Sequence, residues 1–115
     1  MTKTTLYEEF LFLDGVDFAK GLILSFIAIN AALNGAAKVQ VTYMADRFNV
    51  SRKTINKHIN ALVDLGYLSK QPSAAHGQRT TEFCFMGEAE SIAKNIANDI
   101  NNNKTKIKRD NGNKN

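Results

Sequence analysis

The sequence predicts one small domain that is mostly α-helical and carries a small β-hairpin. Its 115 residues suit a single domain. Apolar residues (43%) and charged residues (23%) are close to the averages of globular proteins, which excludes a wholly disordered or fibrous chain. Apolar residues recur every three or four positions along most of the chain, as in helices, whereas residues 79–85 alternate as in a strand. We expect an N-terminal lead-in over residues 1–16, the domain over residues 17–100, and a disordered basic tail over residues 101–115.

The first long helix is expected to begin after Asp17, which can cap it, and to end at Asn34-Gly35. Apolar residues between Phe18 and Leu33 fill more than one face of this helix. The helix should therefore be buried on much of its circumference. After it, residues 39–41 could form a short strand or only an apolar anchor.

The middle of the chain predicts two helices joined by a tight turn. Thr42 opens a short helix that ends at Asn49, a residue type that tolerates the left-handed backbone of such a turn. Ser51 caps a longer helix, which Gly66 ends. Val50 is expected to lock the two helices together by packing between them. This order of elements is that of a helix-turn-helix.

A hairpin, a last helix and a tail should follow. Residues 67–71 are expected to be extended, and residues 72–77 have the composition of a loop. Residues 79–85 alternate in polarity. A stripe of Ala and Ile predicts a last helix over residues 89–100. Residues 101–115 contain six Asn and five Lys or Arg, with too little apolar content to fold alone.

Positive charge gathers in two segments. The chain has 15 basic and 11 acidic residues, a net charge of +4 and a pI near 9.3. Residues 51–79 carry five basic groups against Asp64, and residues 104–115 carry five against Asp110. Both segments suit an anionic partner, and the first coincides with the helix-turn-helix.

Several other classes of protein are disfavoured. The longest apolar stretch covers about twelve positions, whereas a membrane span needs roughly twenty. We find no signal peptide and expect a cytoplasmic protein without a membrane partner. Cys84 is the single cysteine, so no internal disulfide and no CxxC metal pair can form. With two His, one Cys and no Gly-rich phosphate loop, we expect no enzyme, no metal site and no cofactor.

The second helix of the turn carries polar residues that suit DNA. On a helical wheel of about 100° per residue, its outward side lies opposite Ile55, Ile59 and Leu62. Asn can pair with adenine through two hydrogen bonds, and Lys can reach guanine or phosphates. At the start of this helix, Ser51, Arg52 and the positive N-terminal end would meet phosphates. The candidate DNA-binding residues are Thr42, Ser51, Arg52, Lys53, Thr54, Asn56, Lys57, Asn60, Lys70, His76, Gln78 and Arg79.

The plainer interpretation of these side chains is a solvated helix face. The turn before them and the basic hairpin after them favour DNA contact. His58 falls about 60° from Ile55 on the wheel, which indicates a packed or rim histidine rather than a ligand. Cys84 is most simply a small strand residue.

The stretch MADRFNVSRKTINKHINALVDLGYL resembles winged helix-turn-helix proteins of the kind represented by MarR-type and ArsR-type bacterial regulators. The resemblance covers about residues 18–86. It implies a winged helix-turn-helix fold in which residues 51–65 are the recognition helix and residues 72–79 the wing. Arg79 or His76 would then lie near the minor groove or the DNA backbone. The chain also resembles small adaptors of plasmid or phage partition systems and phage replication proteins.

The leading hypothesis is a homodimeric transcriptional regulator that binds double-stranded DNA sequence-specifically. Two-fold dimers usually read half-sites about one helical turn, roughly 34 Å, apart. The alternative is a segregation (centromere-binding) or replication adaptor that coats repeated sites and contacts a protein partner through the tail. A winged helix that binds only proteins is a further alternative. The candidate dimer residues lie on the first and last helices: Phe18, Leu22, Ile92, Ile96 and Ile100.

Overall fold

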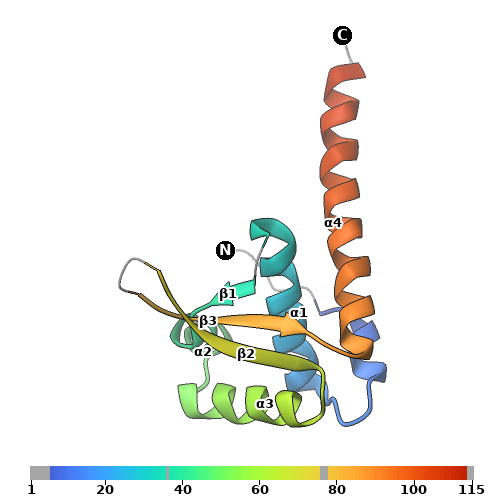
Figure 1. The fold of residues 1–115 in the computed structure, drawn as a ribbon. Coiled ribbons are helices and arrows are strands. Elements are labelled where there is room, and N and C mark those ends of the chain that lie inside the picture. Colours follow the sequence, from blue (N-terminus) through green and yellow to red (C-terminus); the bar gives the residue numbers. More distant parts are fainter. Residues whose placement is uncertain (1–5, 36, 76–77, 114–115) are drawn as a thin grey trace.

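The computed structural model describes residues 6–35, 37–75 and 78–113 and has the expected winged helix-turn-helix architecture (Figure 1). The elements in chain order are η1 (Glu8–Phe12), α1 (Phe18–Asn34), β1 (Ala37–Val39), α2 (Val41–Phe48), α3 (Arg52–Asp64), β2 (Leu68–Ala75), β3 (Gln78–Phe85) and α4 (Glu88–Asn113). Helices α2 and α3 form the helix-turn-helix, and β2 and β3 form the wing. The predicted fold class is confirmed.

Helix α1 begins and ends where local chemistry predicts. The backbone N–H of Lys20 donates to the Asp17 carboxylate at 2.9 Å, so Asp17 is the N-cap. This hydrogen bond, more than the nearby positive charge of Lys20, holds the pKa of Asp17 below its usual value. At the other end, Gly35 has a left-handed backbone with φ of 78°, a conformation that favours glycine.

The described strands form one antiparallel sheet in the order β1-β3-β2. The strand alternative for residues 39–41 holds in part, since β1 covers Ala37–Val39 and Val41 already begins α2. The expected loop over residues 72–77 is wrong over its first part, because β2 continues to Ala75. Pro72 is accommodated since β2 lies at the edge of the sheet, where not every N–H needs a partner.

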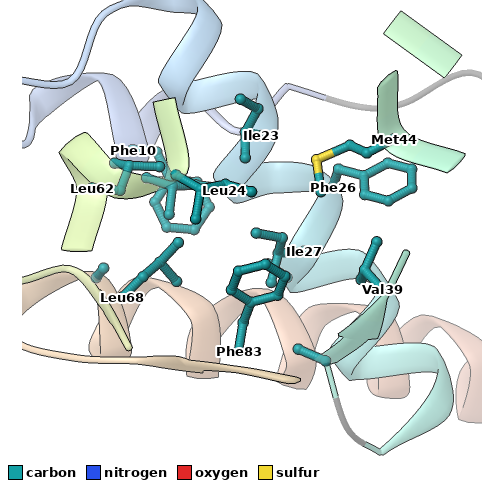
Figure 2. Packing of buried hydrophobic residues seen from close by; sticks show 14 of the residues in the cluster. Phe10, Ile23, Leu24, Phe26, Ile27, Val39, Met44, Leu62, Leu68 and Phe83 are labelled. Carbon is teal, nitrogen blue, oxygen red and sulfur yellow. The ribbon is translucent and has the colours of Figure 1, made fainter. Parts of the chain in front are cut away.

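Helix α1 is the centre of the hydrophobic core. Figure 2 shows its buried side chains pointing into one cluster with residues of the other elements. Leu24 and Ile27 of α1 are fully buried. Facing residues come from η1, α3, β2 and β3: Phe10, Leu62, Leu68 and Phe83. The domain is therefore organised around α1, as its wide apolar surface predicts.

Close packing also joins η1 to α1. A Cβ at Gly21 would lie 2.6 Å from Cδ2 of Leu11 in η1, closer than van der Waals contact allows. Glycine at this buried position of α1 lets η1 lie directly against it. Tyr7, just before η1, donates its backbone N–H to Oγ of Ser25 at 2.9 Å. The predicted lead-in is thus attached to the core.

Helix α4 is longer than the sequence analysis predicted. It was expected to end at Ile100 and to be followed by a disordered tail, but it continues to Asn113. No Gly or Pro stands between Ile100 and Gly112, so no strong helix-ending residue interrupts this segment. One half of α4 lies beside α1, and the other projects beyond the rest of the chain (Figure 1).

Backbone hydrogen bonds, rather than a buried side chain, hold the turn between α2 and α3. Val50 is 41% exposed, so its predicted role as a buried lock is wrong. Its backbone N–H instead donates to the carbonyl of Ala45 at 3.0 Å. Asn49 adopts the predicted left-handed conformation, with φ of 57° and ψ of 46°. The left-handed backbone of Asn49 therefore closes the turn.

Position 49 therefore offers a test of the turn. Asn49→Val should lower the free energy of unfolding by about 1–2 kcal/mol, because a β-branched residue resists the left-handed conformation. Asn49→Gly is the matched control and should change stability by much less, since glycine adopts positive φ without strain. Urea unfolding followed by circular dichroism measures both. Equal losses in the two variants would mean that the Asn49 side chain, and not its backbone, holds the turn.

Candidate nucleic-acid interface

The packing of α3 on the core decides which of its side chains face solvent. Ile55, Ile59 and Leu62 are at most 1% exposed. The opposite side of the helix is exposed, as the helical wheel predicts. That exposed side carries Lys53, Asn56, Lys57 and Asn60.

The start of α3 is fixed by its cap. Oγ of Ser51 accepts a hydrogen bond from the backbone N–H of Thr54 at 3.1 Å, which confirms the predicted N-cap. The two hydroxyl groups of Ser51 and Thr54 also lie 3.0 Å apart in a hydrogen bond. Ser51 and Arg52 are both exposed at this positive helix end. An anion approaching α3 from outside would meet them first.

A groove runs between α2, α3 and β3. Its volume is about 860 Å³. Six of the candidate DNA-binding residues line it: Thr42, Arg52, Lys53, Asn56, Lys57 and Asn60. The described residues that line it include three basic groups but only one acidic group, Asp64. The groove therefore combines positive charge with amide and hydroxyl groups, which suits a polyanion that also carries hydrogen-bonding edges.

Sequence reasoning missed part of this groove. Thr80 and Thr81 of β3 line the side opposite α3, and Val41 lines the end formed by α2. The alternation of β3 was visible in the sequence, but the register that brings its threonines opposite α3 was not. That register pairs Thr81 with Val39 and Pro72.

Lys70 on β2 reaches across to α3. Its Nζ donates a hydrogen bond to Oδ1 of Asn60 at 2.6 Å. Both side chains are exposed. The contact joins the wing to the outward face of α3 and involves two of the candidate DNA-binding residues.

The other candidates on the wing are only partly described. Gln78 and Arg79 lie in β3, where their backbones pair with Ala75 and Ala74. His76 lies outside the described residues. Thr54 also lies on α3, but on another flank of that helix, away from the groove.

This geometry is accompanied by a match to a family of known proteins. The model of the MarR family matches residues 14–79, more than half of the chain, which include the whole helix-turn-helix and strand β2 but only the first two residues of β3. The chain belongs to the MarR family. It is therefore a DNA-binding winged-helix regulator of transcription, in a family of regulators rather than enzymes. Searches of curated proteins and of solved structures found no significant match.

The family assignment bears on the two functional hypotheses. MarR membership supports the predicted DNA-binding transcriptional regulator. It gives no support to the segregation or replication adaptor. The resemblance to MarR-type regulators, found first in the stretch around α2 and α3, is confirmed.

A second, apolar hollow lies on the other flank of α3 in this MarR-family chain. Its volume is about 350 Å³, and α1, the α2–α3 turn and α3 form its walls. Phe18 and Leu22 line it, and Phe18 is 65% exposed. His58 lies at its wall and is half-buried, which agrees with the predicted packed or rim histidine.

The predicted dimer residues do not share one surface. Phe18 and Leu22 line the apolar hollow, whereas the three isoleucines lie on α4. Ile96 is 2% exposed and belongs to the chain's own core, so little of its side chain is open to a second copy. Ile92 and Ile100 are only partly buried.

Within residues 6–35, 37–75 and 78–113, no three His, Cys, Asp or Glu side chains are grouped so that they could hold a metal ion. Over the same part of the chain, no helix combines the length and the apolar character needed to cross a membrane.

Proposed function

We propose that this MarR-family protein reads a specific sequence in double-stranded DNA by placing α3 in the major groove. The observation that carries the proposal is the exposed face of α3. Its lysines and asparagines lie opposite three buried apolar residues and line a groove that is rich in positive charge. An α-helix fits the major groove of B-DNA, where each base pair presents a distinct pattern of donors and acceptors.

The side chains that line the groove have two proposed roles, contact with base edges and contact with phosphates. Asn56 can read base edges through its amide, and Lys53 and Lys57 can donate to guanine or to phosphates. Arg52 at the start of α3 and Thr42 at the start of α2 are the candidates for phosphate contacts, because both lie at positive helix ends. Phosphate contacts would orient α3, and base contacts would supply sequence preference.

The wing supplies the second contact in this proposal. The hairpin of β2 and β3 extends from the body of the domain on the side away from α4 (Figure 1). Its candidate contacts with the DNA backbone or minor groove are Lys70, His76, Gln78 and Arg79. Basic side chains in such positions add affinity that depends strongly on salt.

We also propose that the regulator acts as a homodimer. A single recognition helix seldom supplies enough affinity, and paired helices read two half-sites. Helix α4 is the better candidate for the interface than the hollow near Phe18, because part of α4 stands clear of the domain (Figure 1). Ile92 and Ile100 keep apolar surface on this helix that the chain's own core does not cover completely. A role of the segment after Ile100 in binding a protein partner stays a prediction.

Loss of single side chains from α3 tests the proposed reading of DNA. Asn56→Ala and Lys57→Ala should each weaken binding to the preferred duplex by about 1–3 kcal/mol and relax the choice of base. The measurement is fluorescence anisotropy with labelled duplex, in competition with variants of each base pair. Lys38→Ala is the control, because Lys38 is exposed on β1 and does not line the groove. Unchanged base preference in both α3 variants would contradict the proposal.

Substitutions on α4 test the proposed dimer. Ile100→Glu places a charge on the half-buried apolar stripe and should convert the dimer into a folded monomer. Asn98→Glu adds the same charge at an exposed position of the same helix and should leave the dimer intact. Sedimentation velocity measures the mass, and circular dichroism confirms that both variants fold. A wild-type protein that stays monomeric at all concentrations, or a dimer unaffected by Ile100→Glu, would contradict this interface.

A further inference from the structure

The two asparagines on the outward face of α3 differ in their partners. Asn56 and Asn60 lie about one helical turn apart, and both line the groove. Oδ1 of Asn60 accepts the 2.6 Å hydrogen bond from Nζ of Lys70. The side chain of Asn56 is exposed and has no hydrogen-bonding partner among the residues that the structure describes. The two asparagines therefore differ in hydrogen bonding, although they lie on the same surface.

The partner of Asn60 determines what its amide can offer to DNA. An asparagine amide has one acceptor atom, Oδ1, and two N–H donors on Nδ2. Recognition of adenine through two hydrogen bonds needs both atoms, since Oδ1 accepts from N6 and Nδ2 donates to N7. The ammonium group of Lys70 occupies one of the two lone pairs of Oδ1 and places a positive charge beside it, which disfavours the approach of a second donor such as N6 of adenine. The amide keeps both N–H donors of Nδ2 free. Asn60 then complements base edges that carry acceptors, such as N7 and O6 of guanine or O4 of thymine.

The sheet explains why Lys70 can reach Asn60. Lys70 pairs with Phe83 across the ladder, and directly paired residues of an antiparallel sheet point to the same face. Phe83 is buried among the helices on that face. Because Lys70 lies on the edge strand β2, its side chain extends past the core toward the exposed side of α3.

We propose that Lys70 is a positioning residue that fixes the orientation of the Asn60 amide and so makes it a donor to DNA. Asn60 would thereby prefer guanine or thymine acceptors, whereas the unpaired Asn56 remains able to pair with adenine. This inference rests on the proposed reading of DNA by α3. It assigns to Lys70 a role in specificity, in place of the phosphate contact that its charge alone suggests.

The test compares base preference rather than stability, because an exposed hydrogen-bonded pair contributes little to folding. The wild-type protein and variants are bound to a library of duplexes randomised at every position of the preferred site, and the bound fraction is sequenced. Asn60→Ala first identifies the base pair that Asn60 reads. Lys70→Met, which keeps an unbranched side chain but loses the donor, should then reduce discrimination against adenine at that base pair by about fivefold, the effect of one hydrogen bond.

Three further variants isolate the role of Lys70. In the Asn60→Ala background, Lys70→Met should leave the preference at that base pair unchanged, because there is no amide to orient. Lys70→Arg keeps a donor and should preserve the wild-type preference. Lys38→Met removes the same charge from the exposed surface of β1, outside the groove, and should not alter preference at the Asn60 base pair.

Different results would overturn the inference and the proposed function. If Lys70→Met weakened binding to all duplexes equally and left base preference intact, Lys70 would be a phosphate contact and the inference would be wrong. The inference would also be wrong if Asn60→Ala changed no preference while Asn56→Ala did. If neither asparagine variant changed any preference, the reading of DNA by α3 would itself be contradicted.

Discussion

The packing of α3 against α1 is the constraint on which the rest of the structure depends. Ile55, Ile59 and Leu62 recur at the spacing of one helix face, and all three are buried. A rotation of α3 by a single residue, about 100°, would expose this stripe to water and bury charged side chains. The hydrophobic core therefore sets the rotation of α3 and, with it, the face that we propose reads DNA.

The surroundings of that face follow from the same packing. The turn at Asn49 sets α2 beside α3, and the sheet brings the threonines of β3 to the far side of the groove. The described residues that line this groove include three basic groups and, as the acidic group, Asp64 alone, a balance that would attract phosphates. The hydrogen bond from Lys70 to Asn60 is the contact that, in our proposal, fixes the orientation of one amide on this face.

The features that depend on neighbouring residues in the chain could be predicted from the sequence. The features that depend on tertiary packing could not. The caps at Asp17 and Ser51 and the left-handed Asn49 depend on near neighbours in the chain, so residue type and spacing were enough to predict them. The apolar stripe of α3 likewise predicted its outward face. The groove side formed by Thr80, and the contact of Lys70 with α3, depend on strand register and could not be read from spacing. The structure contradicts the expected loop at residues 72–75, the buried lock at Val50 and the expected helix end at Ile100. These errors came from treating polar segments as unstructured and an apolar residue as buried.

The most direct test of the account is an NMR titration of the full-length, ¹⁵N-labelled protein with a duplex selected from a randomised library. The side-chain amide signals of Asn56 and Asn60, together with backbone signals along α3 and the groove, report contact with DNA at the residue level. The account predicts that the largest shifts fall on these two asparagines and on the residues around Lys53 and Lys57. Shifts confined to the apolar hollow around Phe18 or to α4, with the two asparagine amides unchanged, would contradict the claim that the outward face of α3 reads DNA.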